Sequence, residues 1–217
     1  CVMHMDYSRY GEDGVRVLFG NTIDLETNSE IRKFYLFLKS LHRQDIIDII
    51  PSFKSCLIHF NNRLTSYDDF IAFLKQKTEN ISSVQIPEPK SHEIPVHYGG
   101  EYGPDMEFVC SYSGLNEEEV IEIHSSIVYT VFAVGFIPGF PYMGTLDRRI
   151  YAPRLETPRL KVPEGSVGLA QLQTGIYSFE SPAGWRIIGK TNVQLFDATN
   201  KPYSLLQMGD LVRFVPI

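Results

Sequence analysis

Two arginines, Arg154 and Arg159, lie five positions apart in a stretch rich in proline and glycine. A guanidinium group can donate two parallel hydrogen bonds to a carboxylate or a phosphate. Either arginine is therefore a candidate catalytic residue that binds an anionic substrate or stabilises phosphoryl charge. Arginines in loops can also donate to backbone carbonyls and hold the loops in place, and the sequence leaves both roles open.

His124 lies near the C-terminal end of a predicted helix. A histidine beside a cleft can act as a general acid or base near neutral pH. A histidine at the end of a helix can instead be stabilised there by the helix dipole. We treat His124 as a candidate catalytic residue, with the structural role as the alternative.

Three polar residues, Gln171, Gln173 and Thr174, are candidates for binding the substrate. Amide and hydroxyl side chains both donate and accept hydrogen bonds, so these residues can line a polar wall that recognises an amide or urea group. The alternative is that they are strand ends that pair with a neighbouring loop.

Large rings are interleaved with the glycines and prolines between residues 135 and 189. Such rings favour a packed structure over a disordered coil. We expect most of them in the core or in a subunit interface, while Phe140 and Tyr142 are also candidates for stacking on a substrate. The rings belong to Phe136, Phe140, Tyr142, Tyr177 and Trp185.

Several motifs that would define a site on their own are missing. The sequence contains no G-x-x-x-x-G-K-[ST] motif, so no P-loop is predicted. Residues 165–168 (GSVG) are not a nucleophile elbow, because Glu164 occupies the first glycine position. His92 and His97 lack partner ligands and the cysteines are not paired in sequence, so no metal site is predicted.

The composition is that of a globular protein. The 217 residues are 43% hydrophobic and 21% charged, and the net charge of -6 argues against a general binder of nucleic acids or anionic membranes. The sequence has no apolar run long enough to span a membrane and no apolar core after its N-terminus that would indicate a signal peptide. With an odd count of three cysteines, these features predict a reduced, cytoplasmic protein.

The first part of the chain predicts the order strand, helix, strand, strand, helix. Thr27 and Glu30 have the spacing of a capping box for the first helix, and Ser66 can cap the second. This order is most of a ferredoxin-like split βαβ unit, so we expect a small α+β domain over residues 1–88. The predicted strands cover residues 15–19, 45–50 and 56–60.

A polar stretch with two prolines, residues 82–90, is the predicted linker to a second domain over residues 89–217. Two short helices are expected next, one near Pro104 and one capped by Asn116 with Glu119 completing the box. Beyond Tyr129 the chain consists of short apolar runs separated by glycine and proline, which predicts a β-barrel or sandwich.

Several sequence blocks, in a fixed order, identify a family. GFIPGFPYMG, PR…PR…VPEGSVG, QTGIY and SPAGW…IG resemble the signature blocks of the KipI/allophanate hydrolase subunit 1 family. IPVHYGGEYGPD and the final GDLVRFVPI fit its first and last blocks, so the resemblance covers essentially the whole chain. The departures are small: Ala183 and Lys190 stand where the family usually has Gly and Arg.

The resemblance implies a cyclophilin-like β-barrel for residues 89–217, and therefore an α+β protein of two domains. It also implies a component of an ATP-dependent 5-oxoprolinase, which converts 5-oxo-L-proline to L-glutamate. The implied partners are the 5-oxoprolinase A subunit and the 5-oxoprolinase C subunit, which resembles allophanate hydrolase subunit 2. Because no P-loop is present, any ATP site is unconventional or shared with these partners.

The same family contains other functions, and fold similarity alone does not separate them. One alternative is an inhibitor of sensor histidine kinase autophosphorylation. The other is the carboxyltransferase half of an enzyme similar to urea carboxylase, which would depend on a biotinylated carrier.

Overall fold

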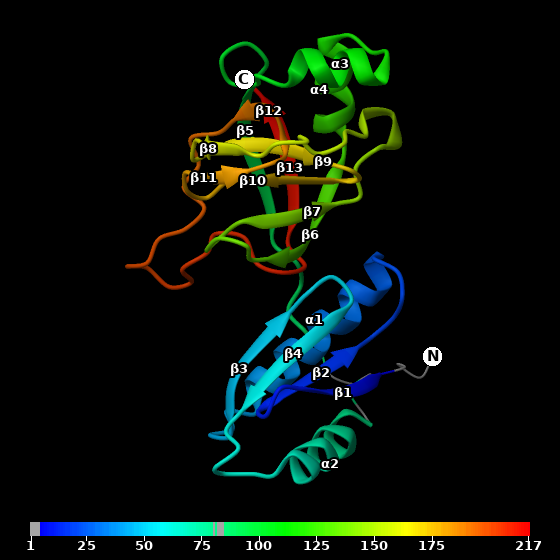
Figure 1. The fold of residues 1–217 in the computed structure, drawn as a ribbon, viewed down its shortest axis with the longest axis vertical. Coiled ribbons are helices and arrows are strands. Elements are labelled where there is room, and N and C mark those ends of the chain that lie inside the picture. Colours follow the sequence, from blue (N-terminus) through cyan, green and yellow to red (C-terminus); the bar gives the residue numbers. More distant parts are fainter. Residues whose placement is uncertain (1–4, 80, 82–84) are drawn as a thin grey trace. The chain divides into compact units, whose positions relative to one another are not determined.

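The computed structural model describes residues 5–79, 81 and 85–217, and it divides the chain into two compact units. Unit 1 is Cys1–Glu88 and unit 2 is Pro89–Ile217 (Figure 1). Of the predicted linker, residues 82–84 lie outside the described part, and residues 85–90 have no regular secondary structure.

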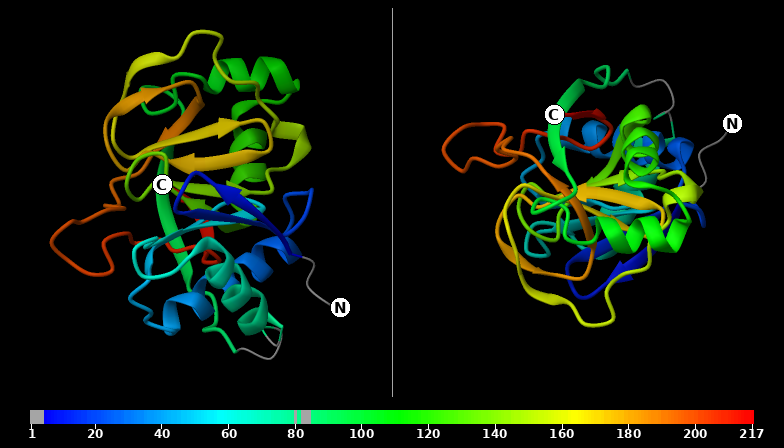
Figure 2. Two further views of the ribbon diagram at one scale, coloured as in Figure 1. Left: turned by 60° about the horizontal axis from the view of Figure 1, so that its bottom comes forward. Right: turned by 90° about the horizontal axis from the view of Figure 1, so that it is seen from above.

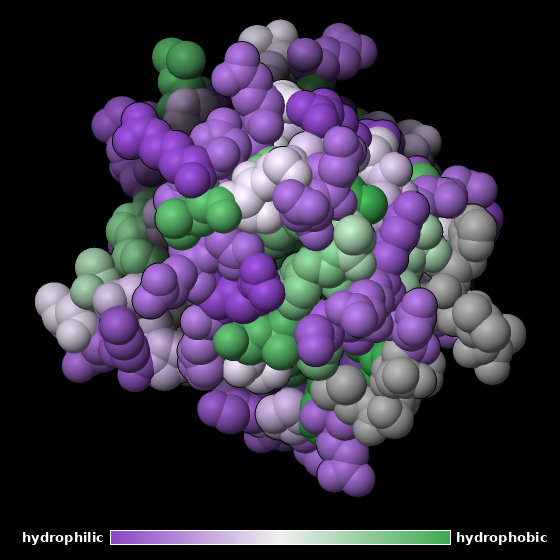
Figure 3. Space-filling model, turned by 90° about the horizontal axis from the view of Figure 1, so that it is seen from below, coloured by the Kyte–Doolittle hydropathy of each residue, from purple (hydrophilic) through white to green (hydrophobic). Residues whose placement is uncertain are grey.

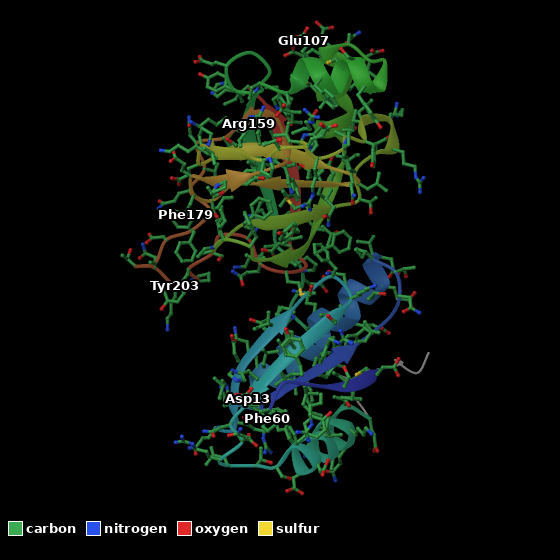
Figure 4. The ribbon with its side chains drawn as sticks, viewed as in Figure 1. Asp13, Phe60, Glu107, Arg159, Phe179 and Tyr203 are labelled. Carbon is green, nitrogen blue, oxygen red and sulfur yellow. The ribbon has the colours of Figure 1, made fainter. Side chains whose placement is uncertain are left out.

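In its described residues, unit 1 is an antiparallel four-stranded sheet with two α-helices. Alternate residues of β4 (Cys56, Ile58 and Phe60) are buried, because side chains of a strand point to opposite faces in turn. Phe60 stacks on Phe70 of α2 with ring centroids 4.8 Å apart, and Figure 4 shows Phe60 between the sheet and α2. The elements are β1 (Asp6–Tyr10), β2 (Gly14–Leu18), α1 (Leu25–Ser40), β3 (Ile46–Pro51), β4 (Ser55–Phe60) and α2 (Tyr67–Thr78).

The strand order of this sheet, β1-β2-β4-β3, differs from the expected ferredoxin-like unit in one respect. The predicted split unit is present as β2, α1, β3 and β4, with β4 between β2 and β3. The edge strand beside β2 is β1, which forms a hairpin with β2 and precedes it in the chain. A full ferredoxin-like arrangement is therefore not confirmed.

The cap of α1 also differs from the prediction. Asp24, and not Thr27, is the N-cap residue, and its carboxylate accepts a hydrogen bond of 2.8 Å from the Thr27 N–H. An aspartate three residues earlier supplies an ionised acceptor to the free N–H groups of the first turn, so the helix begins at Leu25. Ser66 caps α2 as predicted, accepting from the Asp69 N–H.

Unit 2 contains a closed seven-stranded barrel in the order β10-β7-β6-β13-β5-β12-β9. Figures 1 and 2 show the strands of this unit from three directions. The first and last strands, β5 and β13, pair in parallel, which joins the two ends of the unit. A separate two-stranded sheet is formed by β8 and β11. The strands are β5 (Ser91–Tyr98), β6 (Val128–Val134), β7 (Pro141–Gly144), β8 (Arg159–Val162), β9 (Ser166–Ala170), β10 (Gln173–Ile176), β11 (Ser181–Ala183), β12 (Arg186–Lys190) and β13 (Leu211–Pro216).

Two helices, α3 (Met106–Ser113) and α4 (Glu117–Ser126), lie together at the barrel, and a short 3-10 helix, η2 (Arg148–Ile150), packs against both. The predicted capping box of α4 is confirmed, because Asn116 and Glu119 exchange both hydrogen bonds. Val109 of α3 and Val120 of α4 are fully buried and belong to the barrel core. The helices thus complete the core that the barrel encloses.

In the described part of the chain, no helix is long and apolar enough to cross a membrane. Figure 3 views unit 1 from the side of α2, where hydrophilic residues predominate and hydrophobic ones form small, separate areas.

Candidate functional site

Unit 2 holds a cavity of about 330 Å³ with a largely aromatic wall, which we call the aromatic pocket. A cavity of this size suits a small ligand. Its wall contains one charged group, the guanidinium of Arg154, and no acidic residue. The lining residues are Phe136, Phe140, Tyr142, Arg154, Pro158, Tyr177, Pro182, Ala183, Gly184 and Trp185.

Phe140 is the centre of the aromatic wall. Its ring lies edge-on to Tyr142, Tyr177 and Trp185, with centroid distances of 4.8, 5.0 and 5.3 Å. Edge-to-face pairs of this kind contribute roughly 0.5–1.5 kcal/mol each beyond the area they bury. Phe140, Tyr177 and Trp185 are 1%, 1% and 5% exposed, so most of the wall is rigid core. The prediction of core rings agrees with these positions.

The glycine of the QTGIY block explains how Phe140 reaches this position. Gly175 on β10 pairs with Tyr142 on β7. A Cβ added at Gly175 would lie 2.7 Å from the Phe140 ring and 2.8 Å from the Pro141 carbonyl oxygen. A residue without a side chain is therefore required for the close approach of the ring to β10.

Phe136 lies at the edge of the pocket and differs from the other rings. It is 64% exposed and has a φ of 70°, a left-handed conformation that few residues with side chains adopt. Its ring meets Phe140 edge-on at 5.9 Å. The strained backbone thus holds an exposed ring beside the aromatic wall.

Arg154 is exposed, and its guanidinium carbon lies 5.9 Å from the centroid of the Trp185 ring. Burial raises the pKa of both the Tyr142 and the Tyr177 hydroxyl, and the positive charge of Arg154 opposes this only in part. Both hydroxyls are therefore protonated at neutral pH. The pocket can bind a small flat molecule against its rings and an anionic group of that molecule at Arg154.

Arg159 does not line the aromatic pocket, and it forms an ion pair with a buried carboxylate. It donates to both oxygens of Asp105 at 2.8 and 2.9 Å, and Figure 4 labels it among the strands of unit 2. Asp105 is 4% exposed. Its carboxylate also accepts a hydrogen bond of 2.7 Å from the Ile187 N–H, and Nη1 of Arg186 lies 3.6 Å from its Oδ1. Arg159 therefore binds a side-chain carboxylate and not the backbone carbonyls named as the alternative, so its role is structural but differs from the expected one.

His124 is fully buried, and both of its ring nitrogens have hydrogen-bond partners. The Thr174 hydroxyl donates to the Gly168 carbonyl (3.2 Å), so it accepts from Nε2–H of His124 at 2.9 Å. Nδ1 then accepts from the Tyr98 hydroxyl at 2.7 Å. Burial lowers the pKa of His124 to about 3, so the ring is neutral at physiological pH. This arrangement favours a structural role for His124, but not the expected interaction with the helix dipole, because the ring is neutral and is held by two side-chain hydrogen bonds.

The three polar candidates do not form one wall. Thr174 is fully buried beside His124, whereas Gln171 is exposed at the turn between β9 and β10 with a φ of 56°. The Gln171 N–H donates to the Ala152 carbonyl at 2.7 Å, which is the loop pairing named as the alternative. Gln173 is the first residue of β10. None of the three lines the aromatic pocket.

The structure adds residues that sequence reasoning did not select. Tyr177 and residues 182–184 complete the pocket, and their signal was present in the QTGIY and SPAGW blocks. Asp105 ends the IPVHYGGEYGPD block, but nothing in that block indicated its burial, which depends on β8 and β12. Within the described residues, no group of three or more His, Cys, Asp or Glu side chains could hold a metal ion, and Cys56 and Cys110 are free thiols.

The chain consists of an α+β unit and a closed barrel that holds an aromatic pocket. Comparison with known protein families assigns a chain of this architecture to one family. The model of the carboxyltransferase domain family, subdomains C and D, matches residues 5–206, and the chain belongs to this family.

Similar proteins carry a more specific name. The chain is 37% identical to the 5-oxoprolinase B subunit of Bacillus subtilis (strain 168), over 95% of this chain and 90% of that protein. It is 40% identical to the 5-oxoprolinase B subunit of Escherichia coli O157:H7, over 87% and 86%. The family expected from the sequence blocks is thus confirmed.

Solved structures agree with the fold. TTHA0988 matches with a TM-score of 0.84 and 30% identity over 94% of this chain, which spans 40% of that longer chain. PH0987 from Pyrococcus horikoshii matches with a TM-score of 0.58 and 40% identity over 98% of this chain and 97% of its own. The urea amidolyase of K. lactis, 19% identical over 98% of this chain and 15% of its own (TM-score 0.78), shares the fold.

Proposed function

We propose that this chain is the B subunit of an ATP-dependent 5-oxoprolinase, which converts 5-oxo-L-proline to L-glutamate together with the A and C subunits. The observation that carries the proposal is 37–40% identity to three 5-oxoprolinase B subunits, over 85–95% of this chain. Similarity of this extent includes both units. The proposed location is the cytoplasm, where ATP is available and the thiols of Cys56 and Cys110 stay reduced.

The proposed reaction opens a stable lactam in three steps. The γ-phosphoryl group of ATP is transferred to the lactam oxygen and ADP leaves, which makes the carbonyl carbon electrophilic. Water attacks this carbon and the ring C–N bond breaks. A second water then releases phosphate and leaves L-glutamate. The reaction needs groups that bind the substrate carboxylate and groups that stabilise phosphoryl charge.

The aromatic pocket supports a role in binding 5-oxo-L-proline. This substrate is a small, nearly flat ring with one carboxylate. The ring matches the wall of Phe140, Tyr142 and Trp185, and the carboxylate matches the Arg154 guanidinium. We propose that partner subunits complete the site, because the pocket wall contains no general base.

The test is to mix this chain with its cognate A and C subunits and follow ADP and glutamate release that depends on 5-oxoproline. We expect release from the full mixture and none when this chain is omitted. No release from folded, assembled subunits would contradict the proposal.

A second candidate function is carboxyl transfer, which the description of the family and the 20% identity to the urea amidolyase of Saccharomyces cerevisiae favour. That function requires a biotinylated carrier. Carboxyl transfer from such a carrier to urea, with no response to 5-oxoproline, would establish it over the first.

A further inference from the structure

A second pocket of about 500 Å³ lies in unit 2, formed by α3, η2 and the turn between β9 and β10. It shares no lining residue with the aromatic pocket. We call it the arginine–tyrosine pocket. Its lining residues are Tyr112, Ser113, Arg148, Arg149, Tyr151 and Leu172.

The charge of this pocket favours an anion. None of its lining residues is acidic. Asp147 accepts two hydrogen bonds from Arg149, with Nη2–Oδ2 and Nε–Oδ1 distances of 2.9 and 3.1 Å. The negative charge of Glu122 also contributes to the raised pKa of Arg149. Arg148 is exposed and, within the described residues, its guanidinium has no acidic or hydrogen-bonding partner. It is therefore available to a phosphate, which a guanidinium can bind through two hydrogen bonds.

The other wall of the pocket is aromatic. Tyr112 is 55% exposed and stacks on Phe108 at 5.7 Å, so its ring is supported from one side. The Tyr151 ring lies 6.3 Å from the Tyr112 ring and is tilted by 35° to it, and both rings line the pocket. An exposed, supported ring is a surface on which a nucleobase can stack.

We propose that the arginine–tyrosine pocket binds a nucleoside phosphate, with the base against Tyr112 and Tyr151 and a phosphate at Arg148. A simple phosphate would not use the rings, and an uncharged base would not use the guanidinium. The assignment of this ligand as ATP rests on the proposed function. The sequence contains no P-loop, so an arginine and two rings take the place of a glycine-rich phosphate cradle.

The experiment measures Mg·ATP binding to the full chain by equilibrium dialysis. Arg148→Glu should weaken binding at least tenfold, and Tyr112→Ala should also weaken it. The matched control is Arg63→Glu, which changes an exposed arginine of unit 1 and should leave binding unchanged. Inorganic triphosphate should bind more weakly than ATP to the wild type, and Tyr112→Ala should remove this difference.

Equal ATP binding by the wild type and Arg148→Glu would overturn the inference, and so would the absence of binding to the wild type at millimolar ATP. The proposed function fails separately. If the assembled subunits show no turnover of 5-oxoproline but ATP binding depends on Arg148, the nucleotide site is supported and the proposed function is wrong. If turnover is present and Arg148→Glu leaves the KM for ATP unchanged, the proposed function is supported and the nucleotide site is wrong.

Discussion

At the scale of single residues, the proposed substrate site depends on Arg154. It supplies the charge of the aromatic pocket, and its exposure means that the fold does not require it. Arg154→Ala should lower kcat/KM for 5-oxoproline in the assembled enzyme by about 10- to 100-fold, the loss of a charge-assisted hydrogen bond. Arg154→Lys should recover part of this loss.

The check on Arg154 is to compare steady-state kinetics with thermal unfolding of the same variants. Unchanged unfolding is expected, because the side chain is exposed. Full kcat/KM in a folded Arg154→Ala enzyme would remove this residue from the proposed site.

His124 predicts a pH dependence of stability. Its pKa is about 3 in the folded protein and near 6.5 when unfolded, so the unfolded state binds the extra proton between these values. The stabilising contribution is complete above pH 6.5 and is lost as pH falls toward 3. Denaturant unfolding of the wild type should lose about 2 kcal/mol between pH 7 and pH 5 from this group.

The variant His124→Gln isolates that contribution, because the other titrating groups are common to both proteins. Its free energy of unfolding should fall less than that of the wild type over the same interval, by about 2 kcal/mol. Parallel pH profiles for the two proteins would contradict the burial argument.

At the scale of elements, Asp105 connects the start of α3 to β8 and β12. Removing the Arg159 side chain leaves this buried carboxylate with fewer partners. Arg159→Met should lower the free energy of unfolding by about 2 kcal/mol. Lys161→Met is the control on the same strand, since its pair with Glu180 is exposed and should contribute less than about 1 kcal/mol. Equal losses in urea unfolding would argue against the buried pair.

The contact between β10 and β7 makes a second prediction at this scale. Gly175→Ala should displace Phe140, lower the free energy of unfolding by about 1–3 kcal/mol and impair 5-oxoproline turnover. Gly184→Ala, also in the pocket wall, should be tolerated, because its added Cβ would meet its nearest atom at 3.7 Å. Denaturant unfolding and turnover of both variants check this, and a tolerated Gly175→Ala would refute the packing argument.

At the scale of the whole molecule, unit 2 should fold by itself. Its main core cluster contains only residues of Pro89–Ile217, and the pairing of β5 with β13 closes its barrel. A fragment of residues 89–217 should unfold cooperatively in denaturant, with the fluorescence of Trp185 and circular dichroism changing together. A broad transition, or one that differs between the probes, would show that this unit needs unit 1.

Local sequence patterns were sufficient for much of the fold. The alternation of Cys56, Ile58 and Phe60 predicted β4 and its buried face, and Asn116 with Glu119 predicted the start of α4. The order of blocks from GFIPGFPYMG to SPAGW identified the family. These features depend on residues close in the chain, where propensity, capping and side-chain periodicity act directly.

The roles of the candidate site residues required the tertiary structure. Arg154 and Arg159 look alike in sequence, but a buried carboxylate 54 positions from Arg159 binds that arginine and not Arg154. The sequence makes His124 a candidate cleft residue, but in the structure both of its ring nitrogens form hydrogen bonds with Tyr98 and Thr174. The sequence by itself determined the family, the helices α1 to α4, the strands β2 to β4 and the presence of packed rings between residues 135 and 189. Burial and long-range pairing decided which polar groups are available to a ligand, because both depend on residues that only folding brings together.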